Sequence, residues 1–422
     1  MKRGKNMLIK NASLIITPSE VKKNQSILIE GNIIKKIGPS KGMDKTDEVI
    51  DASGFLVMPG LINAHTHLAM TLFRGYEDNL PLQKWLEKIF PVEDRLTEKH
   101  VYWGSMLGCL EMIKSGTTCF NDMYYFMDEV AKSVGKTGIR GCLTRAISSK
   151  GNWKKRLKTM TEKIKNIKNS SRIEWILGPH AIYTCSEELL VRIKELADNY
   201  NKKIHIHVSE TEKELKDCLR EHGKRPVEYL DDIGLMSNRT IAAHCCWLND
   251  KEMDILSKRG VSVVHNPVSN MKLAAGIAPV VKMLEKSINV SLGTDGAASN
   301  NNLDMFEEMK TASLLQKISM KNSLALDAKT CLKMATINGA KALGINSGVI
   351  ESGKKADLIL INLKSPNLKP MHNPYSTIVY SCHGENVDTT IVDGKVLMKN
   401  RKTSLDEEKI YEKIEDCKAE LF

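Results

Sequence analysis

The stretch Phe55-Leu56-Val57-Met58-Pro59-Gly60-Leu61-Ile62-Asn63-Ala64-His65-Thr66-His67 carries the strongest indication of the fold. Its apolar part predicts a buried strand, and two histidines separated by one residue follow it. In a strand, residues i and i+2 point to the same side, so His65 and His67 can converge on one ion. Neutral imidazole is a good ligand for zinc and similar metals. On its own, the spacing also suits two surface histidines or a hydrogen-bonded pair, so a metal site can be inferred only with support from other segments.

Seven further strand-like segments follow, each of them before a helical stretch. One such helix begins after Ser186, a favourable N-cap, and repeats its apolar residues with a helical period. Eight units of this kind predict a closed (β/α)8 TIM-like barrel, whose reactive groups lie where the strands end. The strands are expected near residues 57–63, 117–122, 139–146, 173–178, 203–208, 239–244, 261–265 and 290–294.

The two ends of the chain have a different pattern from the middle. Residues 7–56 alternate short strands with turns, and the segments 356–361 and 389–396 have the same character. This arrangement predicts one small β-sandwich domain built from both chain termini. We therefore expect the first part of the β-sandwich at 1–56, the metal-dependent barrel at 57–348 and the second part of the β-sandwich at 349–422.

The composition is that of an ordinary globular protein. Of the 422 residues, 42% are hydrophobic and 27% are charged. No run of about 18 uncharged apolar residues occurs, so we expect no membrane segment. The N-terminal region lacks the apolar core and the cleavage site of a signal peptide. The ten cysteines form no CxxC motif, which favours a reducing, cytoplasmic location.

The positive net charge does not indicate a nucleic-acid-binding protein. The charge of +11 comes from 62 basic and 51 acidic residues, and the excess lysines are dispersed over predicted helices. Nucleic-acid surfaces cluster their charge beside stacking aromatic residues, whereas aromatic residues make up only 5% of this chain. We therefore expect a solvated lysine-rich surface and no nucleic-acid partner.

Several metal-ligating residue types fall at the predicted strand ends. They are His65 and His67 after the first strand, His207 after the fifth, His244 after the sixth and Asp295 after the eighth. Residues at these ends meet on one face of a barrel. Three histidines and a carboxylate complete a coordination shell while leaving one position for water.

Each of these residues also has an explanation without a metal. His207 alone, like His205, suits a core histidine, and His244 suits a hydrogen-bonded strand end. Asp295 could cap the next helix, and Glu210 could be a helix-start charge that the helix dipole favours. Their shared position at strand ends makes five independent accidents improbable. The sequence therefore predicts a metal site.

Such a site has a defined chemistry. A divalent cation lowers the pKa of its bound water enough to give hydroxide near neutral pH. Glu210 can then transfer protons as a general acid and base. We expect His244 to orient the attacking water, and Asp295 to accept a proton from it while ligating the ion.

The same segments resemble a known family. Residues 59–67, 207–210 and 294–299, together with His244, resemble the amidohydrolase superfamily in its mononuclear deaminase branch. Residues 70–75, 91–97 and 178–180 resemble the methylthioadenosine/S-adenosylhomocysteine deaminases within it, and the chain closely resembles the archaeal 5'-deoxyadenosine deaminases. The resemblance covers essentially the whole chain.

The resemblance implies a role for each candidate residue. It implies one divalent metal, usually zinc, held by His65, His67, His207 and Asp295. It also implies that Glu210, His244 and Asp295 are catalytic and that Glu210 and Asp295 contact the substrate. For the substrate, it implies that Glu93 holds the ribose hydroxyls and that His180 and Ser299 line the nucleoside pocket. Trp85 would cover the base, and Arg145 and a second arginine would bind an amino-acid tail. Arg156 is the candidate for that second arginine, although its surroundings depart from the family pattern.

Two substrate-side positions keep an ordinary alternative. Without the resemblance, we would interpret Glu93 as a solvent-exposed charge beside Arg95. The ribose role is chemically suitable, because an ionised carboxylate can accept hydrogen bonds from two vicinal hydroxyls. Trp85 suits ordinary core packing as well as a lid over the base. The departure around Arg156 leaves the tail recognised by the site, and hence the preferred substrate, open.

The expected activity is hydrolytic deamination of 5'-substituted adenosines to inosine derivatives and ammonia. The candidate substrates are 5'-deoxyadenosine, S-methyl-5'-thioadenosine and S-adenosylhomocysteine, with adenosine as a further one, and relatives commonly form homo-oligomers. One alternative keeps the barrel but acts on guanine or triazines, as a deaminase or chlorohydrolase. A binuclear hydantoinase would need a lysine in the fourth strand, where 173–178 has none. The remaining alternative is a catalytically inactive scaffold.

Overall fold

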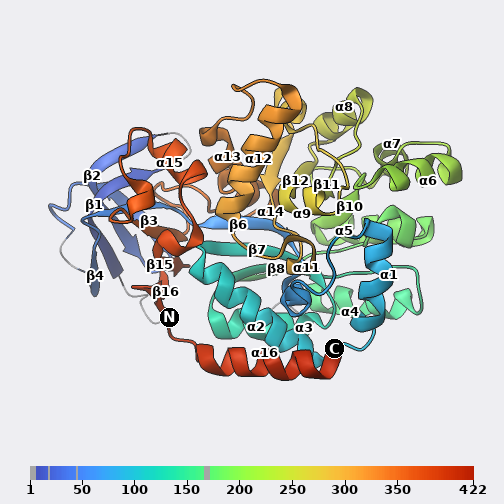
Figure 1. Cartoon of the computed structure of the whole chain (residues 1–422), viewed down its shortest axis with the longest axis horizontal. Coiled ribbons are helices and arrows are strands. Elements are labelled where there is room, and N and C mark those ends of the chain that lie inside the picture. The colour runs from blue at the N-terminus through green and yellow to red at the C-terminus, as the bar shows by residue number, and fades with distance from the viewer. Residues whose placement is uncertain (1–5, 18–19, 44–45, 166–171) are drawn as a thin grey trace.

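Eight parallel strands form the centre of the molecule (Figure 1). The computed structural model describes residues 6–17, 20–43, 46–165 and 172–422. One half of the barrel contains β6 (Leu61–Thr66), β7 (Thr117–Tyr124), β8 (Arg140–Arg145) and β9 (Ile173–Trp175). The other half contains β10 (Ile204–Val208), β11 (Thr240–His244), β12 (Ser262–His265) and β13 (Asn289–Leu292).

Backbone contacts join the two halves into a closed ring. A parallel bridge between Leu177 and Ile204 connects the end of the first half to β10. On the other side, the backbone N–H of Asp295, just after β13, donates to the carbonyl of His65 in β6 over 3.0 Å. The predicted (β/α)8 barrel is confirmed.

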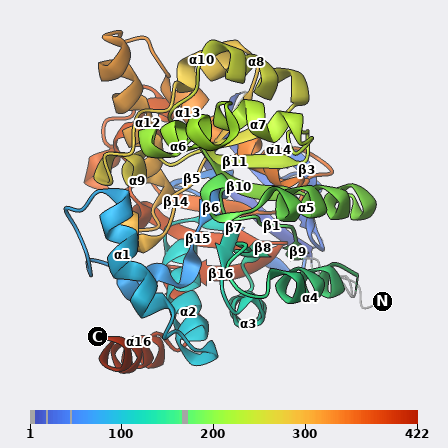
Figure 2. The ribbon, with the colours of Figure 1, turned by 90° about the vertical axis from the view of Figure 1, so that its right-hand side faces the viewer.

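Helices surround this ring of strands (Figure 2). Two of them begin at side-chain caps, because Thr97 and Ser186 accept backbone N–H groups of the first turn, and Ser186 is the cap expected from the sequence. The surrounding elements are η1 (Leu68–Phe73), α1 (Leu82–Glu93), α2 (Glu98–Lys114), α3 (Met127–Thr137), α4 (Trp153–Lys165), η2 (Ile182–Thr184), α5 (Glu187–Tyr200), α6 (Glu212–His222), α7 (Pro226–Asp232), α8 (Asp250–Arg259), α9 (Pro267–Lys272), α10 (Val280–Glu285), α11 (Ala297–Asn300), α12 (Met305–Met320), α13 (Ala328–Met334) and α14 (Ile337–Leu343).

The strand expected at 57–63 is two strands, which corrects the prediction at this point. β5 (Phe55–Pro59) pairs with strands of the terminal sheet, whereas β6 belongs to the barrel. The chain passes between them at Gly60, where a Cβ atom would lie 2.1 Å from the methyl carbon of Thr118. Only glycine allows this close approach, and the apolar pattern runs through it without a break.

The terminal sheet is built from both ends of the chain. Antiparallel pairing of β5 with β14 (Leu358–Asn362) connects the two parts. The other strands are β1 (Asn6–Ile16), β2 (Val21–Glu30), β3 (Ile33–Gly38), β4 (Glu48–Asp51), β15 (Val387–Val392), β16 (Lys395–Lys399) and β17 (Lys402–Thr403). They form the small β-sandwich domain expected from the sequence, seen at the left of Figure 1.

The C-terminal segment also contains helical elements that the strand pattern did not predict. They are η3 (Pro366–Leu368), α15 (Pro374–Tyr380), η4 (Gly384–Asn386) and α16 (Glu407–Leu421). α16 runs along α2 of the barrel (Figure 1), and His100 of α2 contacts Glu420 of α16 over 2.9 Å. The domain boundaries at 56 and 348 stay a prediction.

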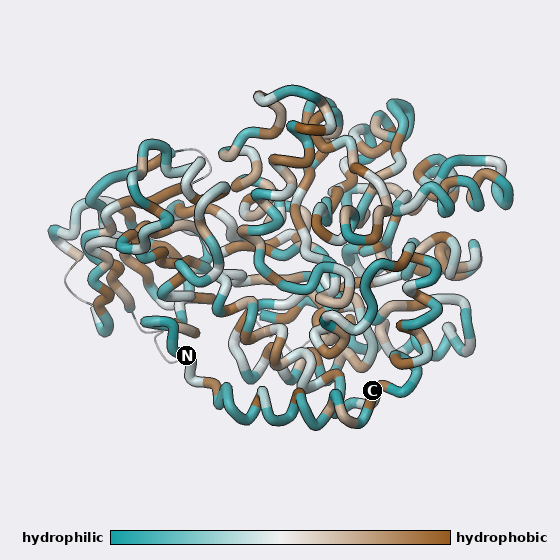
Figure 3. The backbone as a smooth tube through the Cα atoms, in the orientation of Figure 1, coloured by the Kyte–Doolittle hydropathy of each residue, from teal (hydrophilic) through white to brown (hydrophobic). Residues whose placement is uncertain are grey.

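Apolar segments gather between the barrel strands and the helices, and polar residues cover the outer turns (Figure 3). This distribution is the one expected for a barrel with a helical outer layer. Within the described ranges, no helix has both the length and the apolar character needed to cross a membrane.

Candidate active site

The predicted metal ligands lie at or just after the carboxyl ends of barrel strands, and helices α1, α4 and α11 add Trp85, Glu93, Arg156 and Ser299 around two neighbouring cavities. An inner cavity of about 70 Å³ is lined by His67, Trp85, Glu93, His180, His207, Glu210, His244, Asp295 and Ser299, among others. An outer cavity of about 690 Å³ shares Glu93 and His180 with it and extends to Arg145 and Arg156. Small-molecule sites usually occupy roughly 300–1,000 Å³, so the two cavities together suit a ligand of nucleoside size.

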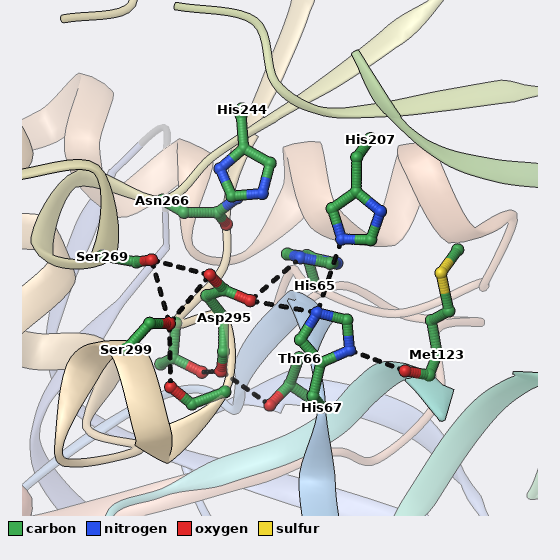
Figure 4. Close-up of polar contacts among 12 residues, drawn as sticks. His65, Thr66, His67, Met123, His207, His244, Asn266, Ser269, Asp295 and Ser299 are labelled. Atoms are coloured by element: carbon green, nitrogen blue, oxygen red, sulfur yellow. Dashed lines mark hydrogen bonds and ion pairs between the residues drawn. The ribbon is translucent and has the colours of Figure 1, made fainter. Parts of the chain in front are cut away.

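The imidazoles of His65, His67 and His207 and the carboxylate of Asp295 point toward one another (Figure 4). Asp295 Oδ1 lies 3.3 Å from Nε2 of His65 and 3.2 Å from Nε2 of His67. The Nε2 atoms of His67 and His207 are 3.4 Å apart. Ligands about 2.0–2.1 Å from a tetrahedral zinc ion are separated by roughly 3.3 Å, so this spacing fits such an ion.

The protonation of two rings also fits a cation. His67 Nδ1 lies 2.6 Å from the carbonyl of Met123, and His207 Nδ1 lies 2.7 Å from the carbonyl of His180. A carbonyl oxygen only accepts, so each neutral ring carries its proton on Nδ1 and a lone pair on Nε2. Burial lowers the pKa of His67, but the adjacent Asp295 raises it to about 9, so positive charge is favoured at this position. With a cation between the two rings, both lone pairs would face it.

Asp295 is held by two hydroxyl groups. Its Oδ2 accepts hydrogen bonds from Ser269 Oγ at 2.6 Å and from Ser299 Oγ at 2.9 Å, so Oδ1 is the atom that faces the histidines. Burial raises its pKa, but the adjacent His65 and His67 hold the pKa of Asp295 well below its usual range. The carboxylate is therefore ionised, as a metal ligand must be.

Three of the strand ends have a strained backbone. Ser209, His244 and Asp295 adopt φ values of 51°, 72° and 62°, in the left-handed region that side-chain-bearing residues rarely adopt. These residues follow or end β10, β11 and β13, and the turns direct the adjacent side chains into the inner cavity. Strain of this kind concentrates at functional sites.

Glu210 is buried beside His244. Burial raises the pKa of Glu210, and its Oε1 lies 3.9 Å from Nε2 of His244. His244 Nδ1 lies 2.8 Å from Oδ1 of Asn270, an acceptor, and 3.3 Å from Nδ2 of Asn266, a donor. The shorter contact places the His244 proton on Nδ1, so Nε2 faces the cavity. Both side chains are positioned to exchange protons with a group in the inner cavity.

The loop that carries Glu210 is fixed by Glu214. The carboxylate of Glu214 accepts the backbone N–H of Ser209 at 2.9 Å and that of Glu210 at 2.8 Å. Thr211 caps α6 by accepting the N–H of Glu214, which brings that side chain under the loop. Burial raises the pKa of Glu214 to about 7.

Glu93 lies at the junction of the two cavities. It accepts a hydrogen bond from Tyr124 Oη at 2.7 Å, and burial raises its pKa to about 7. The alternative of a solvated charge beside Arg95 is wrong, because Glu93 is buried and Arg95 donates to the carbonyl of Leu421. His180, whose pKa burial lowers to about 4, is neutral beside it.

The outer cavity contains both predicted tail-binding arginines. Arg145 is half-buried, and burial together with the nearby Arg156 lowers its pKa. Arg156 donates to the carbonyls of Ser148, at 2.8 Å, and Lys150. Lys150, Glu93 and Asp94 also line this cavity, so basic side chains outnumber acidic ones there by three to two.

Two further alternatives from the sequence are also wrong. The N-cap of α11 is Gly296, so Asp295 does not cap that helix. α6 begins at Glu212 after the Thr211 cap, so Glu210 precedes the helix and lines the cavity instead.

His207 and His205 are buried as core histidines would be, but both also contact other histidines of the cluster. Trp85 is buried and lines the inner cavity, so it packs and faces the site at once.

Sequence reasoning missed several supporting residues. They are Tyr124, Glu214, Ser269, Asn270 and the contact of His205 with His65. A signal existed for two of them. Thr211 and Glu214 have the spacing of a helix capping box, and His205 and His207 repeat the His-x-His spacing of the first strand.

Comparison with known proteins adds a second kind of support. The profile described as Amidohydrolase family matches residues 56–397. A 5'-deoxyadenosine deaminase of Methanothermobacter thermautotrophicus is 49% identical over 423 residues, which cover 97% of this chain and 99% of that protein. A 5-methylthioadenosine/S-adenosylhomocysteine deaminase of Thermococcus sibiricus is 51% identical over 400 residues, covering 93% and 94%. The crystal structure of an adenosine deaminase from Xanthomonas campestris with bound zinc superposes with a TM-score of 0.96 at 33% identity, covering 99% of each chain.

Proposed function

Because the chain belongs to the amidohydrolase family, we propose that it is a metal-dependent aminohydrolase acting on 5'-substituted adenosines. The products are the corresponding inosine derivatives and ammonia. The observation that carries the proposal is the convergence of three histidines and one aspartate from the ends of β6 and β10 and the turn after β13. The names of the relatives that match almost the whole chain at about half identity support the substrate class.

We assign the metal to His65, His67, His207 and Asp295, and we propose that it is zinc. The mixed nitrogen and oxygen donor set suits zinc, and a related structure contains this ion. When bound, the metal lowers the pKa of a coordinated water enough to supply hydroxide near neutral pH. Asp295 contributes the negative charge of the donor set, and the hydroxyls of Ser269 and Ser299 fix its orientation.

Glu210 is the proton carrier in this proposal. Deamination needs one proton from water at N1 of adenine and another at the departing amino group. Burial gives Glu210 a raised pKa, which suits a group that both takes up and releases a proton near neutral pH. As the C6–N bond breaks, a carbonyl forms at C6 and ammonia leaves. His244 orients the attacking water through Nε2, because Asn270 holds its Nδ1 proton.

The remaining inner-cavity residues position the nucleoside. Glu93, in its ionised form, accepts both ribose hydroxyls, and Tyr124 holds one of its oxygens at 2.7 Å. His180 lines the cavity as a neutral ring, while Trp85 covers the base. Ser299 lines the same cavity and also bonds to Asp295, which links the nucleoside pocket to the metal ligands.

The outer cavity receives the 5'-substituent. Arg145 and Arg156 give it a positive charge, which suits the carboxylate of an amino-acid tail. Arg156 uses donors on two backbone carbonyls, so Arg145 is the stronger candidate for reading the tail. A small 5'-group leaves this cavity to water, and the site can accept both kinds of substrate.

We further propose a cytoplasmic, homo-oligomeric enzyme with no nucleic-acid partner. The ten cysteines are all free and buried, which supports a reducing compartment. The dispersed lysines and the low content of aromatic residues support the absence of a nucleic-acid surface.

Ammonia release from the purified, zinc-loaded protein tests the proposal. The substrates to compare are adenosine, 5'-deoxyadenosine, methylthioadenosine and S-adenosylhomocysteine, with guanine and a triazine as the alternative class. Rates with 5'-substituted adenosines that exceed those with guanine and the triazine would support the proposal. Turnover of guanine or the triazine alone would refute the substrate class, and no turnover with bound metal would favour the scaffold.

A further inference from the structure

Two strands on opposite sides of the barrel each carry a His-x-His pair. His65 lies in β6 and His67 directly follows it, and β10 carries His205 and His207. In the outer positions, His67 and His207 face each other through their Nε2 atoms. In the inner positions, His65 and His205 also contact each other, and His205 has no part in the chemistry described above.

The contact between the inner pair is a short hydrogen bond across the barrel. His65 Nδ1 lies 2.7 Å from His205 Nε2, and the ring centroids are 4.9 Å apart. Both side chains are 0% exposed, so water does not compete for either nitrogen. A buried hydrogen bond of this length fixes the relative orientation of the two rings.

The direction of this hydrogen bond follows from the role of His65. A histidine that ligates a metal through Nε2 must carry its proton on Nδ1. The Nδ1–H of His65 therefore donates, and Nε2 of His205 accepts. If His205 donated instead, His65 would carry its proton on Nε2, the atom that faces Asp295 and the candidate metal position.

We propose that His205 is a positioning residue of the metal centre: it accepts the Nδ1–H of His65 and so directs the Nε2 lone pair of His65 toward the ion. This inference rests on the proposed function, because it needs a metal at His65. His67 and His207 donate to backbone carbonyls, which no side-chain substitution removes. His65 is thus the one histidine of this ligand set whose Nδ1 partner is a side chain.

The test compares zinc affinity in variants that keep or remove the acceptor. His205→Gln keeps an acceptor oxygen, whereas His205→Leu fills the space without one. His205→Met, apolar but flexible, replaces the leucine variant if that protein does not fold. His265→Leu is the matched control, because His265 is buried at the end of β12 and its ring nitrogens have no hydrogen-bond partner among the described residues. Competition with a chromophoric chelator gives the zinc dissociation constant, and circular dichroism checks the fold.

We expect His205→Leu to weaken zinc binding by about 10–100-fold, as removal of such partners usually does. His205→Gln should stay within a few-fold of wild type, and His265→Leu should bind zinc as wild type does. Equal affinity of His205→Leu and wild type would overturn the inference. So would an equal loss in His205→Leu and His205→Gln, or in the His265 control, because packing alone would then explain it.

This experiment separates the inference from the proposed function. Zinc affinity is measured without substrate, so a wild-type protein that binds zinc but deaminates none of the nucleosides would refute the activity and leave the variant comparison valid. A wild-type protein that does not bind zinc would overturn both.

Discussion

The Nε2 atoms of His67 and His207 lie 3.4 Å apart, and each ring has its Nδ1 proton on a backbone carbonyl. Two neutral rings in this arrangement would direct two lone pairs at each other in a partly buried site, which is unfavourable without a cation between them. The backbone holds the rings in this arrangement from two different strands. Metal binding should therefore contribute to the stability of the folded protein as well as to its chemistry.

The first prediction is that zinc stabilises the folded state. Ligand linkage gives about 2.7 kcal/mol of added stability at a free zinc concentration 100 times the dissociation constant. Thermal unfolding of metal-stripped protein, with and without added zinc, measures the shift in the midpoint. The His207→Ala variant should show a much smaller shift, because it lacks one ligand. An equal shift in both proteins would place the stabilising ion elsewhere.

The second prediction concerns proton transfer by Glu210. Glu210→Gln keeps the shape of the side chain but removes its titration, so turnover should fall by about 10²–10⁴-fold. Zinc content should stay at the wild-type level, because Glu210 is not in the proposed ligand set. Glu212→Gln, two residues away in the first turn of α6, is the matched control and should keep normal turnover. Near-normal turnover of Glu210→Gln would refute the role of Glu210.

The sequence could predict the barrel and the convergence of the cluster because both depend on local signals. Buried strands appear as apolar runs, and His65, His207 and Asp295 follow such runs directly. Once the strands close into a ring, their carboxyl ends meet on one face without further information. The clustering of these residues therefore follows from periodicity and topology, and their roles stay a proposal.

The supporting contacts could not be predicted because they join segments that no local pattern connects. Ser269, 26 residues before Asp295, reaches its carboxylate from α9, and Tyr124 reaches Glu93 from β7. Each contact depends on loop shapes that are set by three-dimensional packing. The break between β5 and β6 was missed for the opposite reason, since the apolar run continues through Gly60 although the chain leaves one sheet for another.

The third prediction is that nucleoside affinity depends on pH through Glu93. Burial raises its pKa from 4.5 to about 7, so the carboxyl group is largely protonated below that pH and ionised above it. The ionised form accepts both ribose hydroxyls, and affinity should therefore rise as the pH increases through about 7. The loss of one charge-assisted hydrogen bond at low pH corresponds to about tenfold in affinity. The free energy of unfolding depends on pH in the opposite direction to nucleoside affinity. The raised pKa of Glu93 stabilises the folded state below pH 4.5, and this contribution is lost as the pH rises through about 7.

Binding of 5'-deoxyadenosine to the Glu210→Gln variant measures this dependence with strongly reduced turnover and without titration of Glu210. Isothermal titration calorimetry between about pH 6 and 8 gives the affinity, on either side of the raised pKa. Introducing Glu93→Gln into the same variant should remove the pH dependence. A pH profile unchanged by Glu93→Gln would assign the titration to another group.

The fourth prediction concerns the reading of the substrate tail. Arg145→Ala should lower kcat/KM for S-adenosylhomocysteine by about 10–100-fold, the effect of losing a hydrogen bond to a charged group. 5'-Deoxyadenosine has no carboxylate, so its kcat/KM should change by only a few-fold. Arg156→Ala serves as the comparison, because Arg156 already donates to Ser148 and Lys150. Equal losses for both substrates in Arg145→Ala would show that Arg145 does not read the tail.

The fifth prediction concerns the clamp formed by Glu214. Its two carboxylate oxygens accept the N–H groups of Ser209 and Glu210, and an amide can offer only one acceptor oxygen. In Glu214→Gln the second N–H would face an NH2 group, at a cost of about 1–3 kcal/mol for an unpaired buried donor. The loop should shift, and kcat should fall with little change in KM or in zinc content. Glu93 and three of the proposed ligands lie on other segments, and His207 precedes the loop in β10, where the carbonyl of His180 holds its ring. Lys213→Gln, the adjacent exposed residue, controls for a change in the first turn of α6. Wild-type kcat in Glu214→Gln, at the wild-type unfolding temperature, would show that Glu210 keeps its position without the clamp.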